Sequence, residues 1–386
     1  MTLSPTQPLR AARTPHIPTE QVLRGLTVRL APMPGAHSVA ACLTVRCGSR
    51  DDAPGPAGAA HLAEHLRVVA EAEVDRAAVP VFARTDIART YFQAIGPPEA
   101  VPAMIRRLVG ILCSGTDRQA PAAVLEAERQ AVCLETRRMD INPLLRAGPL
   151  FAAAAATEPG MDAIGRTTLA SIGAVTADQV TALVADRYRP TNAVLCLAGP
   201  PAALTAVTDL IAAALPESSP RLGARPAAVP IAPAATDVLC VPELDGLVAL
   251  TLIRSRADHH PDPHALLADA GPLVEAGRRI GLPLLGRTTI SNADQQADVL
   301  CWRPETRAEQ LLDALRAVLA APRRGLTDQV VERVRRIRRQ EEQFTRATPL
   351  GRALAVADRD QAATPAAGAA VPALWQVERG RATAAA

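Results

Sequence analysis

The spacing of hydrophobic residues changes along the chain and separates expected strands from expected helices. Short runs rich in Val, Leu and Thr favour strands, whereas Leu and Val that recur every three to four residues favour helices. In the first half we expect strands at 25–33, 38–47, 89–95 and 192–199. We expect the first two to pair with each other across "PGAH". Helices are expected from about 58, at 99–113, at 121–139 and after Thr176, which is placed as an N-cap.

The second half of the chain repeats this order. Strands are predicted at 237–242, 247–255, 286–290 and 297–303, and helices at 263–277, 307–320 and 326–345. Two halves with the same strand–strand–helix opening indicate a duplicated domain. The predicted fold class is therefore α+β, with two homologous domains that each pack helices on a largely antiparallel sheet.

Changes in composition mark the expected domain boundaries. Residues 215–236 contain five prolines, which is typical of a linker. We therefore divide the chain into a flexible N-terminal lead (1–19), a first domain (20–214), the Pro-rich linker (215–236), a second, shortened domain (237–360) and an Ala/Pro-rich tail (361–386) that we expect to be partly disordered.

Composition and charge exclude several classes of function. A net charge of +3 and an aromatic content of 2% argue against nucleic-acid binding. No apolar run is long enough to cross a bilayer, and the first residues lack the apolar core of a secretory signal. The seven cysteines are scattered without zinc-ribbon spacing. We therefore expect a cytoplasmic protein with reduced cysteines and no membrane or nucleic-acid partner.

Two of the seven histidines, His61 and His65, lie four residues apart with Glu64 between them. On a helix this spacing places both imidazoles on one face, where they can bind one metal ion, and Glu64 borders the same face. A Glu at this position can polarise a metal-bound water. The alternative is that both histidines are polar edges of a core helix. A third protein ligand decides between these interpretations, because catalytic zinc needs three protein ligands.

The strongly helical stretch 125–138 offers two candidates for the third ligand. Glu128 and Glu135 are seven residues apart and therefore two turns apart on one helix face. Either carboxylate could complete the site while the other supports one of the ligands.

These residues resemble the pitrilysin/insulinase family of inverzincin peptidases, which includes the mitochondrial processing peptidase. "GSRDDAPGPAGAAHLAEHL" (48–66) is similar to the segment that leads into the family's zinc helix, and "ERQAVCLE" (128–135) to its third-ligand helix. "RTDIARTYF" (84–92) is similar to its substrate-binding edge strand, and 165–199 to the end of its first domain. The resemblance covers about residues 20–200.

The resemblance implies a role for each candidate residue. His61, His65 and Glu135 would bind Zn²⁺, Glu64 would act as the general base, and Glu128 would support a ligand. The chain would form half of a clam-shell chamber. The edge strand would bind substrate through a further group of residues, namely Phe82, Ala83, Arg84 and Thr85.

The sequence departs from the family's pattern at several positions. Phe82 occupies the place of an Asn in the edge strand, and the alternative for its side chain is packing in the core. On the duplicated helix His264 has no second His after it, and His259 and His260 lie in a Pro- and Asp-rich loop before it, so no second zinc site is expected. The family places an Arg and a Tyr of the second domain near the zinc, but Leu284 occupies the Tyr position. The two tyrosines, Tyr91 and Tyr188, both lie in the first half.

The intact zinc motif predicts a zinc metalloendopeptidase that cleaves short unfolded peptides or leader segments. The departures in the second half predict that the chain is the catalytic subunit of a heterodimer. A homologous partner subunit without the zinc motif would supply the Arg/Tyr pair, and a homodimer is the other arrangement. Two alternatives stay open. The chain could be a non-catalytic structural subunit of the same family, or an accessory protein that binds peptide and holds zinc without turnover.

Overall fold

The computed structural model describes most of the chain in segments. They are 18–53, 55–74, 79–86, 88–115, 119–140, 142, 167–217, 238–239, 247–255, 271–291, 295–303, 307–320, 328–357 and 371–377. Most of the predicted linker and the N-terminal lead lie outside these residues, as does His264.

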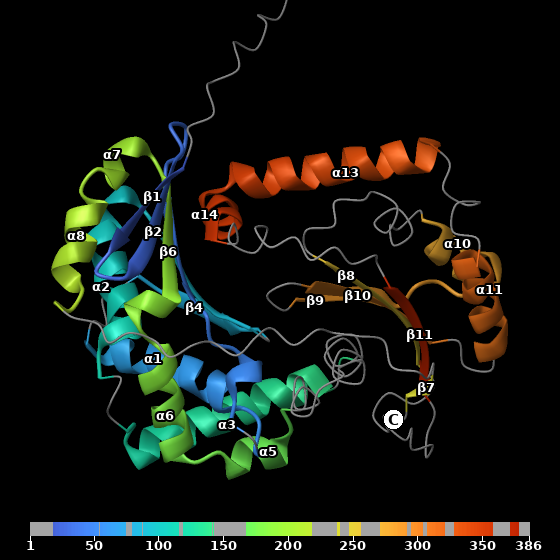
Figure 1. Cartoon of the computed structure of the whole chain (residues 1–386), viewed down its shortest axis with the longest axis horizontal. Helices are drawn as coiled ribbons and strands as arrows, with labels where there is room; N and C mark the ends of the chain where they lie inside the picture. The colour runs from blue at the N-terminus through green and yellow to red at the C-terminus, as the bar shows by residue number, and fades with distance from the viewer. Residues whose placement is uncertain are drawn as a thin grey trace, which may run out of the picture.

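The first half is built on a six-stranded sheet with the order β1-β2-β6-β3-β5-β4 (Figure 1). Its strands are β1 (Thr19–Leu23), β2 (Leu26–Pro32), β3 (Val39–Val45), β4 (Val81–Thr85), β5 (Thr90–Gly96) and β6 (Ala193–Gly199). The expected pairing of β2 with β3 is wrong, because β6 lies between them, parallel to β2 and antiparallel to β3. All seven residues of β6 are buried, and a strand that is apolar on both faces gains most in a central position.

Strand β1 was not predicted. It forms a hairpin with β2 through Arg24 and Gly25, which have φ angles of 45° and 92°. A two-residue turn with both residues at positive φ matches the twist of antiparallel strands. The strand is mostly polar and lies at the sheet edge, so it carries little hydrophobic signal.

Helices cover one face of this sheet (Figure 1). They are α1 (Ala59–Val74), α2 (Val101–Cys113), α3 (Ala122–Asp140), α5 (Leu169–Ala174), α6 (Ala177–Arg187), α7 (Pro201–Leu204) and α8 (Val207–Ala214). Apolar residues of α1, α2 and α3 form one core with the inner face of the sheet. The predicted N-cap is confirmed, because the hydroxyl of Thr176 accepts a hydrogen bond from the Gln179 N–H.

The second half repeats the topology of the first. Its sheet has the order β7-β11-β8-β10-β9, formed by β7 (Val238–Leu239), β8 (Val248–Ser255), β9 (Gly286–Ser291), β10 (Gln295–Trp302) and β11 (Val371–Val377). β11 is parallel to β7 and antiparallel to β8, as β6 is to β2 and β3. The predicted duplication of an α+β unit is therefore confirmed.

The C-terminal region departs from the sequence prediction in two ways. The tail predicted at 361–386 contains β11, which takes the central place that β6 has in the first sheet. A short strand in an Ala- and Pro-rich segment has a weak intrinsic preference for β structure, and its formation depends on the strands that pair with it. The helix α14 (Pro349–Ala357) was also not predicted, and it follows α13 (Asp328–Ala347) directly. The sheet of the second half is thus closed by a final strand, β11, while the further helix α14 lies between α13 and that strand in the sequence.

The other helices of the second half are α10 (Pro272–Arg279) and α11 (Ala308–Ala320), which pack on each other. Of the helix predicted at 263–277, only the part from residue 271 is described, and there α10 begins at Pro272. Their core is centred on the buried Trp302.

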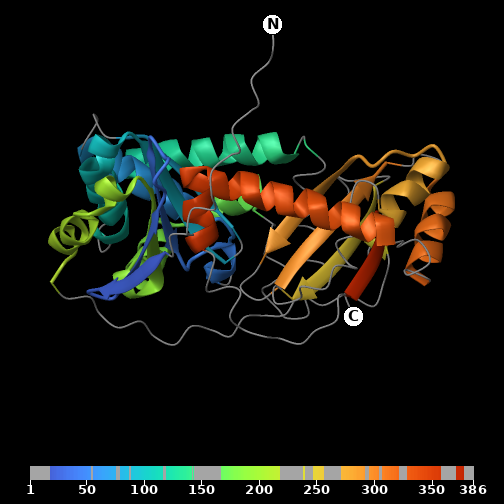
Figure 2. The same cartoon turned by 90° about the horizontal axis from the view of Figure 1, so that it is seen from above.

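Helix α14 connects the two halves. It packs mainly on β2, β3 and β6, on the face of the first sheet opposite to α1, α2 and α3 (Figure 1). Arg29 of β2 donates hydrogen bonds from Nη1 to the carbonyl oxygens of Val356 (2.9 Å) and Ala357 (3.3 Å). Its Nε donates to Glu20 at 2.7 Å. Helix α13 runs from the second half to this contact (Figure 2), so the C-terminal helices return to the first sheet.

Candidate metal centre

The start of α1 is fixed by a carboxylate that precedes the helix in the sequence. Asp52 accepts hydrogen bonds from the Gly58 N–H (2.7 Å) and the Ala60 N–H (2.8 Å). These groups belong to the first turn, where backbone N–H groups have no partner within the helix. Gly58 has a φ of 121°, which a residue with a side chain rarely adopts. The turn is therefore held in place immediately before His61.

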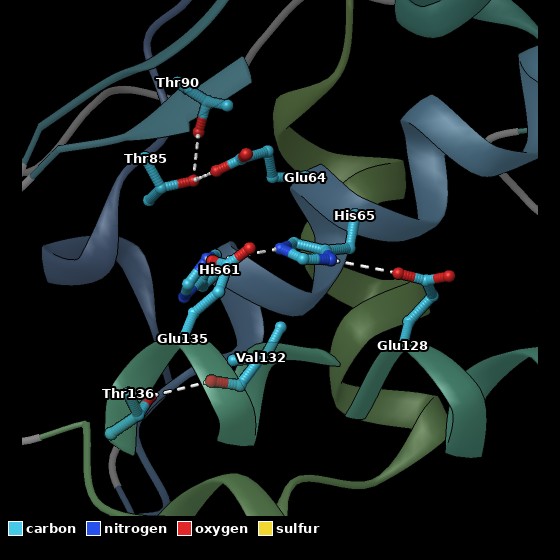
Figure 3. A network of polar contacts seen from close by, with 9 residues as sticks. All are labelled: His61, Glu64, His65, Thr85, Thr90, Glu128, Val132, Glu135 and Thr136. Atoms are coloured by element: carbon cyan, nitrogen blue, oxygen red, sulfur yellow. Dashed lines mark hydrogen bonds and ion pairs between the residues drawn. The ribbon is translucent and has the colours of Figure 1, made fainter. Parts of the chain in front are cut away.

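His61, His65 and Glu135 converge where α1 crosses α3 (Figure 3). Nε2 of His61 lies 3.2 Å from Oε2 of Glu135, and Nε2 of His65 lies 3.5 Å from the same oxygen. One potential ligand atom from each of the three residues lies within 4.8 Å of the others. The two imidazole rings meet edge to face, with centroids 5.0 Å apart. Helix α1 thus provides two imidazole nitrogens and α3 one carboxylate oxygen around a common centre.

This donor set fits a zinc ion. Zinc bonds to nitrogen and oxygen are about 2.1 Å long, so tetrahedral ligands lie about 3.4 Å from each other. The separations of 3.2 and 3.5 Å agree with that spacing. Two histidines and one glutamate are also a known ligand set of catalytic zinc. His61, His65 and Glu135 are therefore the residues that would hold the ion.

The geometry distinguishes the two candidate glutamates of α3. Glu135 faces both Nε2 atoms, whereas Oε2 of Glu128 lies 2.9 Å from Nδ1 of His65, on the far side of that ring. A carboxylate on Nδ1 fixes the tautomer and leaves Nε2 free to bind a metal ion. Figure 3 shows Glu128 and Glu135 on opposite sides of His65.

The site is a cluster of charges with shifted pKa values. Burial favours the neutral form of His61, but the hydrogen bond to Glu135 and the nearby carboxylates of Glu64 and Asp52 raise its pKa overall. The hydrogen bond from His61 lowers the pKa of Glu135. Burial raises the pKa of Glu64, although both histidines and Thr85 oppose this effect.

Glu64 has a hydrogen-bond partner on the edge strand. The hydroxyl of Thr85 donates to Oε2 of Glu64 at 2.5 Å, and the hydroxyl of Thr90 lies 3.3 Å from that of Thr85 (Figure 3). Thr90 in turn donates to the carbonyl oxygen of Cys47 at 2.9 Å. The sequence placed Thr85 among residues for substrate, but its hydroxyl points at Glu64. It therefore orients a carboxylate that is itself buried.

The rest of the edge strand alternates between the two faces of the sheet. Ala83 packs against the core under the helices, whereas Phe82 and Arg84 face away from it. The side chain of Phe82 is 66% exposed, so the alternative that it packs in the core is wrong. The guanidinium of Arg84 lies 5.1 Å from the ring centroid of Tyr91 and 3.3 Å from Asp86.

Both tyrosines of the chain are buried in the first half. Tyr188 packs edge to face on Phe92, and burial holds its pKa well above the usual range. Leu284, at the place where the family has a Tyr, packs against the core of the second half. No tyrosine of this chain therefore comes from the second half.

Two functional contacts escaped the sequence analysis. The bond from Asp52 to the start of α1 spans six to eight residues, which is longer than an ordinary N-cap. The acidic pair Asp51–Asp52 before a Gly/Pro-rich segment and a helix was the available signal. The bond between Thr85 and Glu64 depends on how β4 packs on α1, and nothing local in the sequence indicates it.

No known family model and no curated protein matches the sequence of this chain. Solved structures do match its fold. An M16-like peptidase from Alicyclobacillus acidocaldarius is 20% identical, with 90% of this chain and 88% of that chain covered and a TM-score of 0.64. A protease from Helicobacter pylori is 16% identical, with 90% of each chain covered and a TM-score of 0.70. An M16 peptidase inactive domain from Pseudomonas fluorescens is 16% identical, with 90% and 88% covered and a TM-score of 0.66.

The chain therefore has the fold of the M16, or pitrilysin, peptidases over about 90% of its length. This fold is found in proteins described as proteases and in one described as inactive, so it does not decide activity. Among the described helices, none combines the length and the apolar character that a membrane span requires.

Proposed function

We propose that the protein is a zinc metalloendopeptidase. The observation that carries this proposal is the convergence of His61, His65 and Glu135 beside a buried Glu64 whose carboxylate is oriented by Thr85. A metal ligand set and a separately held carboxylate are the two parts that hydrolysis of a peptide bond by an activated water requires.

Each polar group has a distinct task in this proposal. When bound, a zinc ion supplies Lewis-acid chemistry, because it lowers the pKa of water toward about 7 and polarises a carbonyl oxygen. Glu64 accepts the proton of the attacking water and then donates it to the leaving amine. Burial raises the pKa of Glu64, which makes its carboxylate a stronger base toward the attacking water. Thr85 holds the carboxylate in one orientation.

The substrate class follows from the edge strand. β4 is the last strand of the first sheet, so one of its edges has no partner strand within the described sheet. An extended peptide can add to such an edge through backbone hydrogen bonds. Short unfolded peptides or leader segments fit this mode, and they would enter a chamber of which this chain forms one half.

The proposed enzyme works with a second subunit. Leu284 and the burial of both tyrosines leave the substrate without a Tyr from the second half of this chain. We propose that a homologous partner subunit supplies the Arg/Tyr pair; a homodimer is the alternative arrangement. The cytoplasm is the proposed location.

The first test is the zinc content of the chain purified without added metal, measured beside His65→Ala. The proposal expects about one zinc per chain, lost in the variant. The second test is cleavage of unfolded peptides by the wild type and by Glu64→Gln, alone and mixed with a candidate partner. Glu64→Gln should keep the zinc and lose the cleavage. Full cleavage by Glu64→Gln would refute its role.

The same measurements separate the alternatives. A chain that binds no zinc, alone or with a partner, would support the structural-subunit alternative. A chain that binds zinc and peptide but cleaves nothing with any partner would be a peptide-binding protein.

A further inference from the structure

An exposed pair of apolar side chains lies on the edge of the first sheet. Phe82 of β4 is 66% exposed and Ile95 of β5 is 44% exposed. Phe82 is paired with Gln93 in the register of the two strands, so Ile95 is its diagonal neighbour on the same face. Diagonal neighbours of this kind are about 7–8 Å apart, within reach of an aromatic ring.

This pair lies beyond the helix that covers the rest of the face. Helix α14 packs mainly on β2, β3 and β6, and the buried residues beneath it end at Tyr91 on β5. Phe82 and Ile95 therefore continue an apolar surface past its cover. β4 lies on the side of the first sheet that faces the second half (Figure 1, Figure 2).

An apolar side chain on a free edge strand is a hazard, because such edges pair with other strands and aggregate. Arg84, two residues further on the same face, is 65% exposed and partly counters this hazard. An aromatic residue at this place gains burial when another strand lies beside it and brings a side chain to the same face.

The strand that carries Phe82 also reaches the metal centre. Thr85, three residues further along β4, donates its hydroxyl to Glu64. Three residues of a strand span about 10 Å. Consider a peptide that adds to this edge with its cleaved bond beside Glu64. It would place one of its side chains beside Phe82, about three residues from that bond.

We propose that Phe82 and Ile95 form a subsite that selects an apolar side chain of the substrate, about three residues from the cleaved bond. This inference rests on the proposed peptidase function and adds a preference to it. Asn in place of Phe82 would offer an amide to the peptide backbone, whereas the phenyl ring offers contact area to a side chain. The chain thus prefers peptides that carry an apolar side chain at one position.

The test measures peptide binding separately from cleavage. Zinc-loaded Glu64→Gln chain is titrated with fluorescent peptides about ten residues long, in which Leu or Ser occupies each position in turn. We expect Leu to bind about fivefold more tightly than Ser at one position, the upper end of what a cross-strand pair contributes. Phe82→Asn should abolish that difference, so that the Leu and Ser peptides bind with equal affinity.

A matched control is available on α13. Phe344 is 77% exposed and lies outside the first sheet, so Phe344→Asn removes an equally exposed ring without touching the edge strand. It should keep the full preference. Phe82→Leu should also keep it, because an apolar side chain remains.

The outcomes distinguish this proposal from the peptidase proposal. A preference that survives in Phe82→Asn would overturn the subsite, as would the absence of any peptide binding both by the chain alone and by the chain mixed with a candidate partner. Cleavage by the wild type would still support the peptidase. A preference that depends on Phe82, in a protein that cleaves nothing with any partner, would support the subsite and reject the enzyme.

Discussion

The carboxylate of Glu128 accepts a hydrogen bond from Nδ1 of His65 at 2.9 Å, while Nε2 of the same ring faces Glu135. The two nitrogens of one imidazole are thus assigned to different partners. Glu128 holds the proton on Nδ1, so Nε2 carries the lone pair that a metal ion needs.

Replacing Glu128 with Gln should weaken zinc binding about 10- to 100-fold, because contacts that orient a ligand contribute at that level. Competition with a chromogenic chelator measures the affinity. Glu126→Gln makes the same change at an exposed position of α3 and should retain wild-type affinity. Equal affinities of the Glu128→Gln variant and the wild type would show that the hydrogen bond does not tune the ligand.

Thr85→Val should lower kcat by about 10- to 100-fold, since a hydrogen bond to a charged group contributes about 1.5–3 kcal/mol. Zinc content should stay at the wild-type level, because the hydrogen bonds of Thr85 in Figure 3 join it to Glu64 and Thr90 and to none of the three proposed ligands. Thr85→Ser keeps the hydroxyl and should restore most of the rate. A Thr85→Val variant with the wild-type kcat would show that the hydroxyl does not orient Glu64.

The metal-free protein should lose stability as the pH rises from 6 to 8. His61 has a pKa above its ordinary value of 6.5, so its protonated form stabilises the fold fully below the unfolded pKa and ceases to do so as the pH passes the folded pKa. Glu64, whose pKa is raised above 4.5, also costs stability as the pH rises, and its effect begins at the lower pH where a free carboxyl group ionises. Thermal unfolding at several pH values measures the effect.

Zinc should reverse this trend, because the metal binds the neutral imidazole and its affinity rises with pH. The metal-free Glu135→Gln variant is the control. It removes the charge that raises the pKa of His61, and its stability should depend less on pH over this range. A metal-free wild type whose stability rises between pH 6 and 8 would contradict the assignment.

Most of the site could be predicted from the sequence, because its main elements are local. His61, Glu64 and His65 lie within two turns of one helix, and Glu128 and Glu135 lie two turns apart on another. The role of each glutamate required the crossing of α1 and α3, which local spacing does not give. The position of β6 between β2 and β3 was missed for a related reason, since strand order depends on pairs more than 100 residues apart.

Asp52→Ala should destabilise the protein by about 0.5–2 kcal/mol, the usual loss when a helix start loses its side-chain acceptor. It should also weaken zinc binding, because the first turn of α1 carries His61. Asp52→Asn keeps one carbonyl acceptor and should lose less. Chemical denaturation and zinc titration of both variants provide the comparison.

Arg29→Met should destabilise the contact between α14 and the first sheet by about 1.5–3 kcal/mol, since buried hydrogen bonds from a charged group are lost. Hydrogen exchange should become faster in α14 before it does so in α1. Arg279→Met removes an exposed arginine paired with Glu275 and should change stability by less than about 0.5 kcal/mol. Unchanged exchange in α14 would show that apolar packing alone holds the helix.

The return of α14 to the first sheet means that the half with the candidate metal centre is not formed by one continuous stretch of the chain. A fragment that ends at Ala214 would contain every residue of the candidate metal centre. Without α14 it would expose to solvent the apolar face formed by Ala31, Cys42, Tyr91, Val194, Cys196 and Ala198. Such a truncation would aggregate through that face, whereas joining residues 349–357 to it would restore the missing layer. The first sheet and the helices on its two faces therefore come from residues 19–214 and from residues 349–357, which are more than 130 residues apart in the chain.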